Sequence, residues 1–171
     1  MDKATGGLST GGSSVKRHGS RAVANYLIER AREDGDFLTS MQLLKLVYIA
    51  HGWNLAIRHR PLVREAVEAW KYGPVIPDLY HGVKRWGAGF VRHRLPGYFA
   101  SENGFAPEDE ELVSSVLSAY RHLDGLELSN LTHRRGTPWY KVYYEQGGKD
   151  RRHAVIPDRL IKKHFESLLT T

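Results

Sequence analysis

The sequence predicts a mainly α fold, a compact helical domain with a small β element. Residues 41–57 form a run that is apolar almost all round, which is typical of a helix buried at the centre of a domain. Proline stands at the expected start of several other helices, where its missing backbone N–H is not needed. Residues 67–71 alternate with a period of two, which predicts a short strand within a two- or three-stranded element.

The first two helices are expected over residues 21–33 and from Thr39 through the apolar run. Ser20 is the expected N-cap of the first helix, and Asp34-Gly35-Asp36 ends it. Thr39 and Gln42 have the spacing of a capping box, in which each side chain satisfies a free backbone donor of the other residue. This spacing predicts a sharply defined start for the central helix.

The remaining helices follow the strand, and most have a local start signal. They are expected to begin at Pro77, at Pro107, near Leu126, at Thr137-Pro138 and at Pro157. The acidic residues 108–111 suit the positive end of the helix dipole and are expected to form a solvated first turn.

A length of 171 residues suits one folded domain, which we expect over residues 20–171 after a flexible tail at residues 1–19. The tail is rich in Gly, Ser and Thr and has no apolar core of the kind that a signal peptide needs. The sequence has no cysteine, which excludes disulfides and fits a reducing compartment. No apolar run is long enough to cross a bilayer. We therefore expect a cytoplasmic protein with no membrane partner.

The formal net charge of +6 indicates a negatively charged partner, either nucleic acid or an acidic protein surface. The basic residues occur in scattered pairs, with no dense basic run. A nucleic-acid-binding regulator is therefore the alternative and less favoured hypothesis. The pairs that would contact phosphates are Arg134-Arg135, Arg151-Arg152 and Lys162-Lys163.

No pattern of residues indicates catalysis or a bound metal. The chain lacks a nucleophile elbow and a phosphate-binding glycine loop, and its nine histidines show no local ligand spacing. We therefore expect a protein that is not an enzyme and has no metal or cofactor.

A lysine within the central apolar helix must bind something, form an ion pair or join a buried polar network. Lys45 occupies this place, and Glu68, which begins the sequence Glu-Ala-Trp, is its favoured partner. Tyr48 and Trp53 lie on the same helix and are expected to be structural, with Trp53 buried in the core.

The densest group of unusual residues follows the predicted strand, where Trp70, Lys71 and Tyr72 precede the corner Gly73-Pro74. Trp, Tyr and Arg dominate protein interfaces, so these residues are candidates for binding a partner. Packing of Trp70 and Tyr72 into the core is an equally good interpretation of the residues alone. A second candidate segment contains His133, Arg134 and Trp139, and we predict that the two segments lie together and form part of one partner surface.

Three stretches of this chain resemble the Panacea domain over about residues 21–169. They are Lys45-Leu46-Val47-Tyr48-Ile49-Ala50-His51-Gly52-Trp53, Glu68-Ala69-Trp70-Lys71-Tyr72-Gly73-Pro74-Val75-Ile76-Pro77, and Leu128-Ser129-Asn130-Leu131-Thr132-His133 with Pro138-Trp139. The resemblance implies an antitoxin that neutralises a cognate protein toxin. It also implies two possible mechanisms, direct blocking of the toxin or delivery of the toxin to an AAA+ protease such as ClpXP. The family offers no catalytic residues to assign here.

Overall fold

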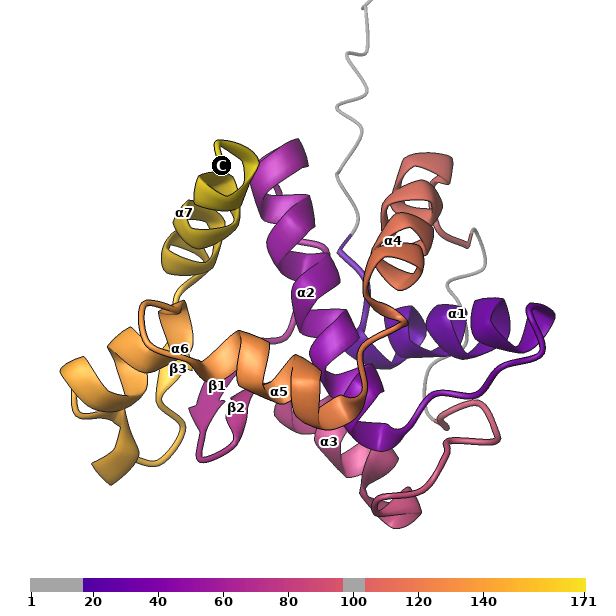
Figure 1. Cartoon of the computed structure of the whole chain (residues 1–171), viewed down its shortest axis with the longest axis horizontal. Helices are drawn as coiled ribbons and strands as arrows, with labels where there is room; N and C mark the ends of the chain where they lie inside the picture. The colour runs from indigo at the N-terminus through magenta and orange to yellow at the C-terminus, as the bar shows by residue number, and fades with distance from the viewer. Residues whose placement is uncertain (1–16, 97–103) are drawn as a thin grey trace, which may run out of the picture.

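The computed structural model of this chain describes residues 17–96 and 104–171. Within this part the fold is a mainly helical domain with one small sheet, as predicted (Figure 1). Residues 1–16 of the predicted tail lie outside the described residues. Residues 17–19 do not fit the predicted boundary, because His18 is buried and its backbone pairs with that of Val63.

The central element is helix α2, Ser40–Arg58, which runs through the middle of the domain (Figure 1). Helices α1 (Ser20–Glu33), α4 (Pro107–Tyr120), α5 (Gly125–His133) and α7 (Asp158–Leu169) pack against it. This confirms the prediction from its apolar run, because a helix enclosed on several sides needs apolar residues on each of them. The predicted capping box is present. The backbone N–H of Gln42 donates to the Thr39 hydroxyl, and the backbone N–H of Thr39 donates to the side-chain oxygen of Gln42.

The remaining helices are short. They are α3 (Pro77–Val83), η1 (Lys84–Trp86), α6 (Pro138–Tyr140), the π-helix η2 (Lys141–Glu145) and η3 (Gly148–Asp150). Proline stands in the first turn of α3, α4 and α6, as predicted. Pro157 is the N-cap of α7 and lies one residue before its first turn.

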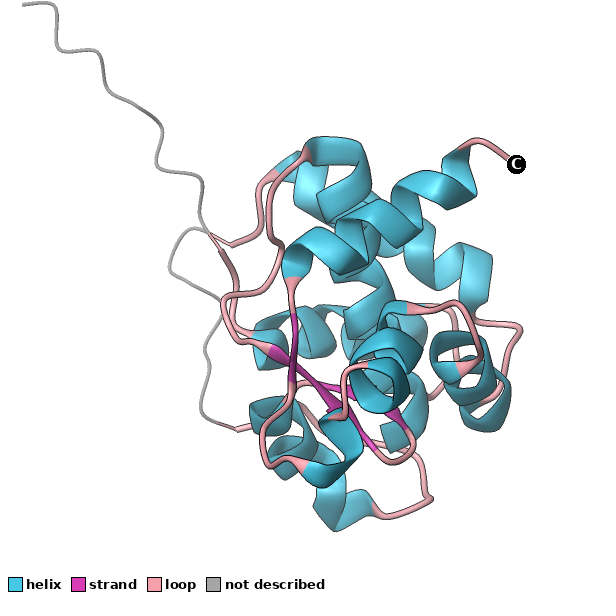
Figure 2. Ribbon diagram, turned by 90° about the vertical axis from the view of Figure 1, so that its left-hand side faces the viewer, coloured by secondary structure: helices cyan, strands magenta, loops and turns pink. Residues whose placement is uncertain are grey.

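The sheet has three antiparallel strands in the order β2-β1-β3, and Figure 2 shows it enclosed among helices. β1 is Val67–Trp70, β2 is Gly73–Val75 and β3 is Val155–Ile156. β1 and β2 form a hairpin with Lys71 and Tyr72 at its turn. Gly73-Pro74 therefore begins a second strand, whereas the sequence indicated only that the first strand ends there.

The start of α1 differs from the prediction, because Gly19 is the N-cap and Ser20 is already helical. The Ser20 amide donates to both carboxylate oxygens of Glu65, over 3.0 and 2.9 Å, and its hydroxyl donates to the same group. A carboxylate from a distant loop thus serves the first turn in place of a local cap.

The first turn of α4 is also not fully solvated, because Asp109 is only 2% exposed. Its carboxylate bonds with His18 Nε2 over 2.8 Å and accepts a bond from Arg60 over 2.8 Å. The ring of Phe105 stacks on His18 with centroids 4.1 Å apart. Asp109 therefore joins three distant segments of the chain.

Candidate partner-binding surface

The two segments singled out in the sequence meet beside the hairpin, as predicted. The indole Nε1 of Trp139 donates to the carbonyl oxygen of Trp70 over 2.6 Å. The hydroxyl of Ser129, on α5, donates to the carbonyl oxygen of Tyr72 over 2.9 Å. These bonds hold both ends of the hairpin turn against the helical part of the domain.

Exposure separates the candidate residues into two groups. Tyr72 is 64% exposed, and Lys71 beside it is exposed as well. Gly73, Pro74 and Trp139 are buried. They shape the hairpin, but a partner cannot contact their side chains directly. The two interpretations of the aromatic residues, core packing and partner binding, therefore have to be decided for Trp70 and Tyr72 separately.

Trp70 is half-buried and belongs mainly to the packing of the domain. Its ring meets that of Tyr80 edge to face, with centroids 5.0 Å apart. Its Nε1 donates to Glu68 over 3.2 Å. Tyr72, by contrast, leaves most of its ring in solvent.

Lys45 does not pair with Glu68, so that prediction is wrong. Its Nζ donates to the carbonyl oxygen of Pro74 over 3.0 Å, and burial lowers the pKa of Lys45 to about 7. Glu68 instead bonds with Trp70 and with His153 Nδ1, the latter over 3.0 Å. Side chains two residues apart in a strand point to the same face of the sheet. Glu68 therefore lies on the same face of β1 as Trp70.

The close approach of Lys45 also explains Gly73. The φ of Gly73 is +116°, and an added Cβ would lie 2.7 Å from Lys45 Nζ. The positive φ therefore favours glycine at this position, and an added Cβ would also displace Lys45 Nζ from its bond to Pro74. The central helix thus fixes the path of the hairpin immediately after Tyr72.

Tyr72 lines one side of a hollow of about 640 Å³, here called the hairpin groove. Its walls come from the start of α2, from α3 and η1, and from the start of α5. Exposed apolar side chains here include Tyr80, which is 36% exposed, and Leu126, which is 69% exposed. The groove therefore presents an apolar rim to solvent next to the hairpin turn.

Lys71 lines a different hollow on the other side of the turn. This basic hollow, of about 530 Å³, lies between β1, the π-helix η2 and the segment that follows it. Its cationic residues are Lys71, Lys149, Arg151 and Arg152. The sequence shows the pair Arg151-Arg152 but does not indicate that it lies beside Lys71. That proximity depends on the pairing of β1 with β3, which the sequence did not predict.

Arg134 lies apart from the hairpin face, although His133 touches it. An added Cβ at Gly73 would lie 3.5 Å from that of His133, which is half-buried. Arg134 instead lines a small pocket of about 180 Å³ with His164 of α7. Burial lowers the pKa of His164, and the charges of Arg134 and Lys141 lower it further.

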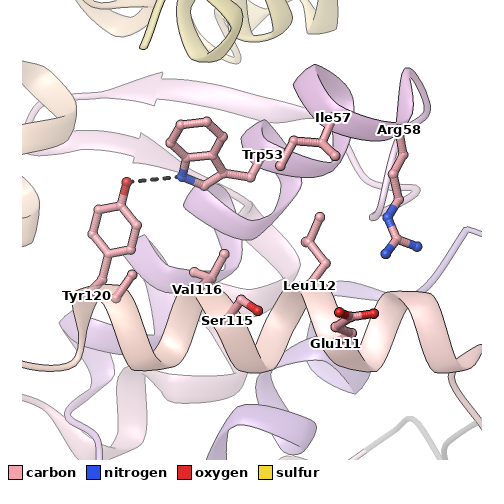
Figure 3. Close-up of a pocket in the computed structure, with 9 residues that line it drawn as sticks. Trp53, Ile57, Arg58, Glu111, Leu112, Ser115, Val116 and Tyr120 are labelled. Atoms are coloured by element: carbon pink, nitrogen blue, oxygen red, sulfur yellow. Dashed lines mark hydrogen bonds between the residues drawn. The ribbon is translucent and has the colours of Figure 1, made fainter. Parts of the chain in front are cut away.

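A fourth hollow, the helix groove, lies between α2 and α4 and has a volume of about 570 Å³ (Figure 3). Figure 3 shows Trp53 and Ile57 facing Leu112, Val116 and Tyr120 across it. Trp53 is therefore only partly buried, which corrects the expectation that it lies within the core. Its Nε1 donates to the Tyr120 hydroxyl over 3.0 Å.

Tyr48 is 2% exposed, and burial raises the pKa of its hydroxyl above the ordinary value.

In residues 17–96 and 104–171, no cluster of three His, Asp or Glu side chains could hold a metal ion. Among these same residues no helix has both the length and the hydropathy of a membrane span.

Comparison with known proteins decides the family. A family model described as "Antitoxin SocA-like, Panacea domain" matches residues 43–140. The chain is 30% identical over 155 residues to the curated protein Antitoxin SocA of Caulobacter vibrioides (strain NA1000 / CB15N), covering 85% of this chain and 81% of the relative. This chain belongs to the SocA-like Panacea family. No solved structure matches it.

The Panacea match covers the hairpin and helices α3, α4 and α5, and it ends at Tyr140, the last residue of α6. Most of the hairpin groove lies inside the matched residues, and the part of its lining that precedes them is Thr39, Ser40 and Met41. Three of the four cations of the basic hollow, Lys149, Arg151 and Arg152, lie outside them.

Proposed function

We propose that this protein is an antitoxin that binds a cognate protein toxin and neutralises it in the cytoplasm. The support is its membership of the SocA-like family and its likeness to an antitoxin over 85% of its length. Neutralisation on this proposal is a binding event, and the chain is not an enzyme.

The observation that carries the binding site is the exposure of Tyr72 on a hairpin that is fixed from several sides. An aromatic side chain that is 64% exposed can bury a large area on a partner. Bonds from Lys45, Ser129 and Trp139 hold the backbone beneath it, so little conformational entropy is lost when it binds. We assign the hairpin groove and the turn above it as the toxin-binding surface.

Two routes lead from binding to neutralisation. The antitoxin blocks the toxin directly, or it delivers the toxin to an AAA+ protease of the ClpXP type. Direct blocking requires only the complex, whereas delivery requires the protease. Measuring the survival and the toxin level of protease-deficient cells therefore separates the two routes.

The test uses the product of the neighbouring gene as the candidate toxin, co-expressed with this protein and also purified for binding measurements. Tyr72→Ala should weaken binding by about 1–2 kcal/mol or more, as truncation of an interface hot spot does, and should reduce cell survival. Leu169→Ala is the matched control, since Leu169 is a 55% exposed apolar residue at the far end of α7.

Both variants must first match the parent in circular dichroism and in melting temperature. If folded Tyr72→Ala binds and neutralises as well as the parent and the control, the hairpin face is not the toxin surface. If no toxin is bound by the parent protein at all, the antitoxin proposal itself is wrong.

A further inference from the structure

The basic hollow beside the hairpin carries an excess of positive charge. Lys71, Lys149, Arg151 and Arg152 line it, and Glu68 is the one carboxylate in its lining. Glu68 is 7% exposed and is already engaged by Trp70 and His153. The four cations outnumber this single carboxylate, so the hollow keeps a net positive charge.

These cations have no carboxylate partners in the described part of the chain. The ion pairs found there all involve other basic residues. Arg151 donates to the carbonyl oxygen of Gln146 over 3.3 Å, and Lys71 lies 5.4 Å from the centre of the Tyr72 ring. Neither contact neutralises a positive charge, so the hollow attracts anions.

The segment that carries three of the cations is held at both ends. Gly148 packs so closely on the π-helix that an added Cβ would lie 2.5 Å from the carbonyl oxygen of Val142. His153 adopts a left-handed backbone conformation with φ of +55° and bonds to Glu68, and the next residue, Ala154, accepts a bond from the Ala69 amide over 2.8 Å. The backbone that carries these cations is thus fixed before any ligand arrives, which lowers the entropy lost on binding.

The shape of the hollow favours a peptide over duplex nucleic acid. Duplex DNA presents regularly spaced phosphates along its axis, so its sites spread cations over a face, along a stripe or along a helix. Here the four cations surround one concavity of about 530 Å³ whose wall includes the Tyr143 and Trp70 rings. A short segment with carboxylate side chains fits this arrangement, since arginine binds carboxylates through paired hydrogen bonds.

We propose that the basic hollow binds an acidic peptide segment, rich in Asp or Glu, on the partner toxin. This rests on the proposed antitoxin function for the source of the segment. Lys71 and Tyr72 are adjacent, so a toxin seated in the hairpin groove places a neighbouring segment at the hollow. Three of the four cations lie beyond residues 43–140, which the family model matches, and on this proposal the hollow adds selectivity for this protein's own toxin to the contact that the groove makes.

The hollow can be tested without the toxin. The probe is a fluorescein-labelled hexaglutamate peptide, followed by fluorescence anisotropy with the full chain at low and at raised salt. A hexaglutamine peptide and a short DNA duplex are the comparison probes. We expect hexaglutamate to bind, hexaglutamine not to bind, and the affinity for hexaglutamate to fall as salt is raised.

The variants test the location of binding. Arg151→Gln with Arg152→Gln should lower the affinity for hexaglutamate at least tenfold. Arg135→Gln with Lys163→Gln removes the same charge from two exposed residues elsewhere and should change it less than twofold. Lys71→Gln with Lys149→Gln provides a second pair in the hollow if the first pair fails to fold.

Equal losses in the hollow and control variants would show an effect of net charge alone and would overturn the proposal. So would absence of hexaglutamate binding, or a DNA duplex that binds more tightly and displaces the peptide. None of these outcomes would contradict the assignment of the hairpin groove as the toxin-binding surface, because that assignment is tested separately with the toxin and Tyr72→Ala. With the toxin in hand, the Arg151 and Arg152 variant should also slow association at least tenfold at low salt.

Discussion

The side-chain nitrogen of Lys45 lies 3.0 Å from the carbonyl oxygen of Pro74, which bonds the central helix to the second strand of the hairpin. The residue is 1% exposed, so this nitrogen is almost wholly removed from water. A buried amine that bonds to a neutral acceptor has no opposite charge to stabilise its protonated form.

The pH dependence of stability should reveal this group. Burial lowers the pKa of Lys45 to about 7 from 10.5, so between these values the unfolded chain binds more protons than the folded chain. The contribution of Lys45 to the free energy of unfolding should therefore rise with pH across this window, by about 1.4 kcal/mol per pH unit at most. Denaturant unfolding at pH 7 to 10 of the parent and of Lys45→Met measures it. The variant should lack this component of the rise, and identical slopes would contradict a lowered pKa.

Gly73→Ala should destabilise the hairpin for two reasons, the positive φ and the contact with Lys45 Nζ. Gly136→Ala is a matched control, because Gly136 also has a positive φ, of +87°, but no atom lies near its added Cβ. The control should lose about 1 kcal/mol from the backbone term alone, and Gly73→Ala should lose clearly more. Thermal melts of both decide the matter. Equal losses would show that the approach of Lys45 imposes no cost.

Removal of residues 17–19 should lower the melting temperature. His18 bonds with Asp109 and stacks on Phe105, so a chain that starts at Ser20 leaves a buried carboxylate with one partner fewer. The comparison is between deletion of residues 1–16 and deletion of residues 1–19. The second protein should be less stable by about 1–3 kcal/mol. If the two melt together, the His18 contacts do not stabilise the fold.

Trp53→Ala should destabilise the protein less than truncation of a fully buried tryptophan, for which about 3–5 kcal/mol is typical. The reason is that Trp53 lies at the helix groove and is only partly buried. Tyr120→Phe removes only the bond from the Trp53 indole and should cost about 0.5–1.5 kcal/mol. Chemical denaturation measures both, and a loss for Trp53→Ala above the stated range would indicate that the groove is closed in solution.

Local signals in the sequence predicted much of the fold. The capping box of Thr39 and Gln42 and the prolines at 77, 107 and 138 act within one turn of their own helices, so neighbouring residues suffice to place them. The apolar run identified the central helix because a fully enclosed helix has no polar face.

Contacts between distant residues could not be predicted in this way. Asp109 looked like one of four acids in a solvated turn, and its burial depends on His18 and Arg60, which come from other segments. The partner of Lys45 was also missed, because every residue has a backbone carbonyl and the sequence does not show which of them lies near Lys45. For the candidate site, both segments were found, but only the packed structure shows that Tyr72 of the first is exposed and Trp139 of the second is buried.

The order of the strands has a consequence for synthesis of this protein. β1 is bordered by β3, and α2 is covered by α7, whose Phe165 ring lies against Gly52 so closely that a Cβ there would collide with it. Both covering elements are translated long after the hairpin and the central helix have left the ribosome. Until then the apolar surface of α2 is open to chaperones and proteases. A chain that ends before α7 would therefore leave part of its central helix open to degradation, so protection of that helix is complete only after α7 has been translated.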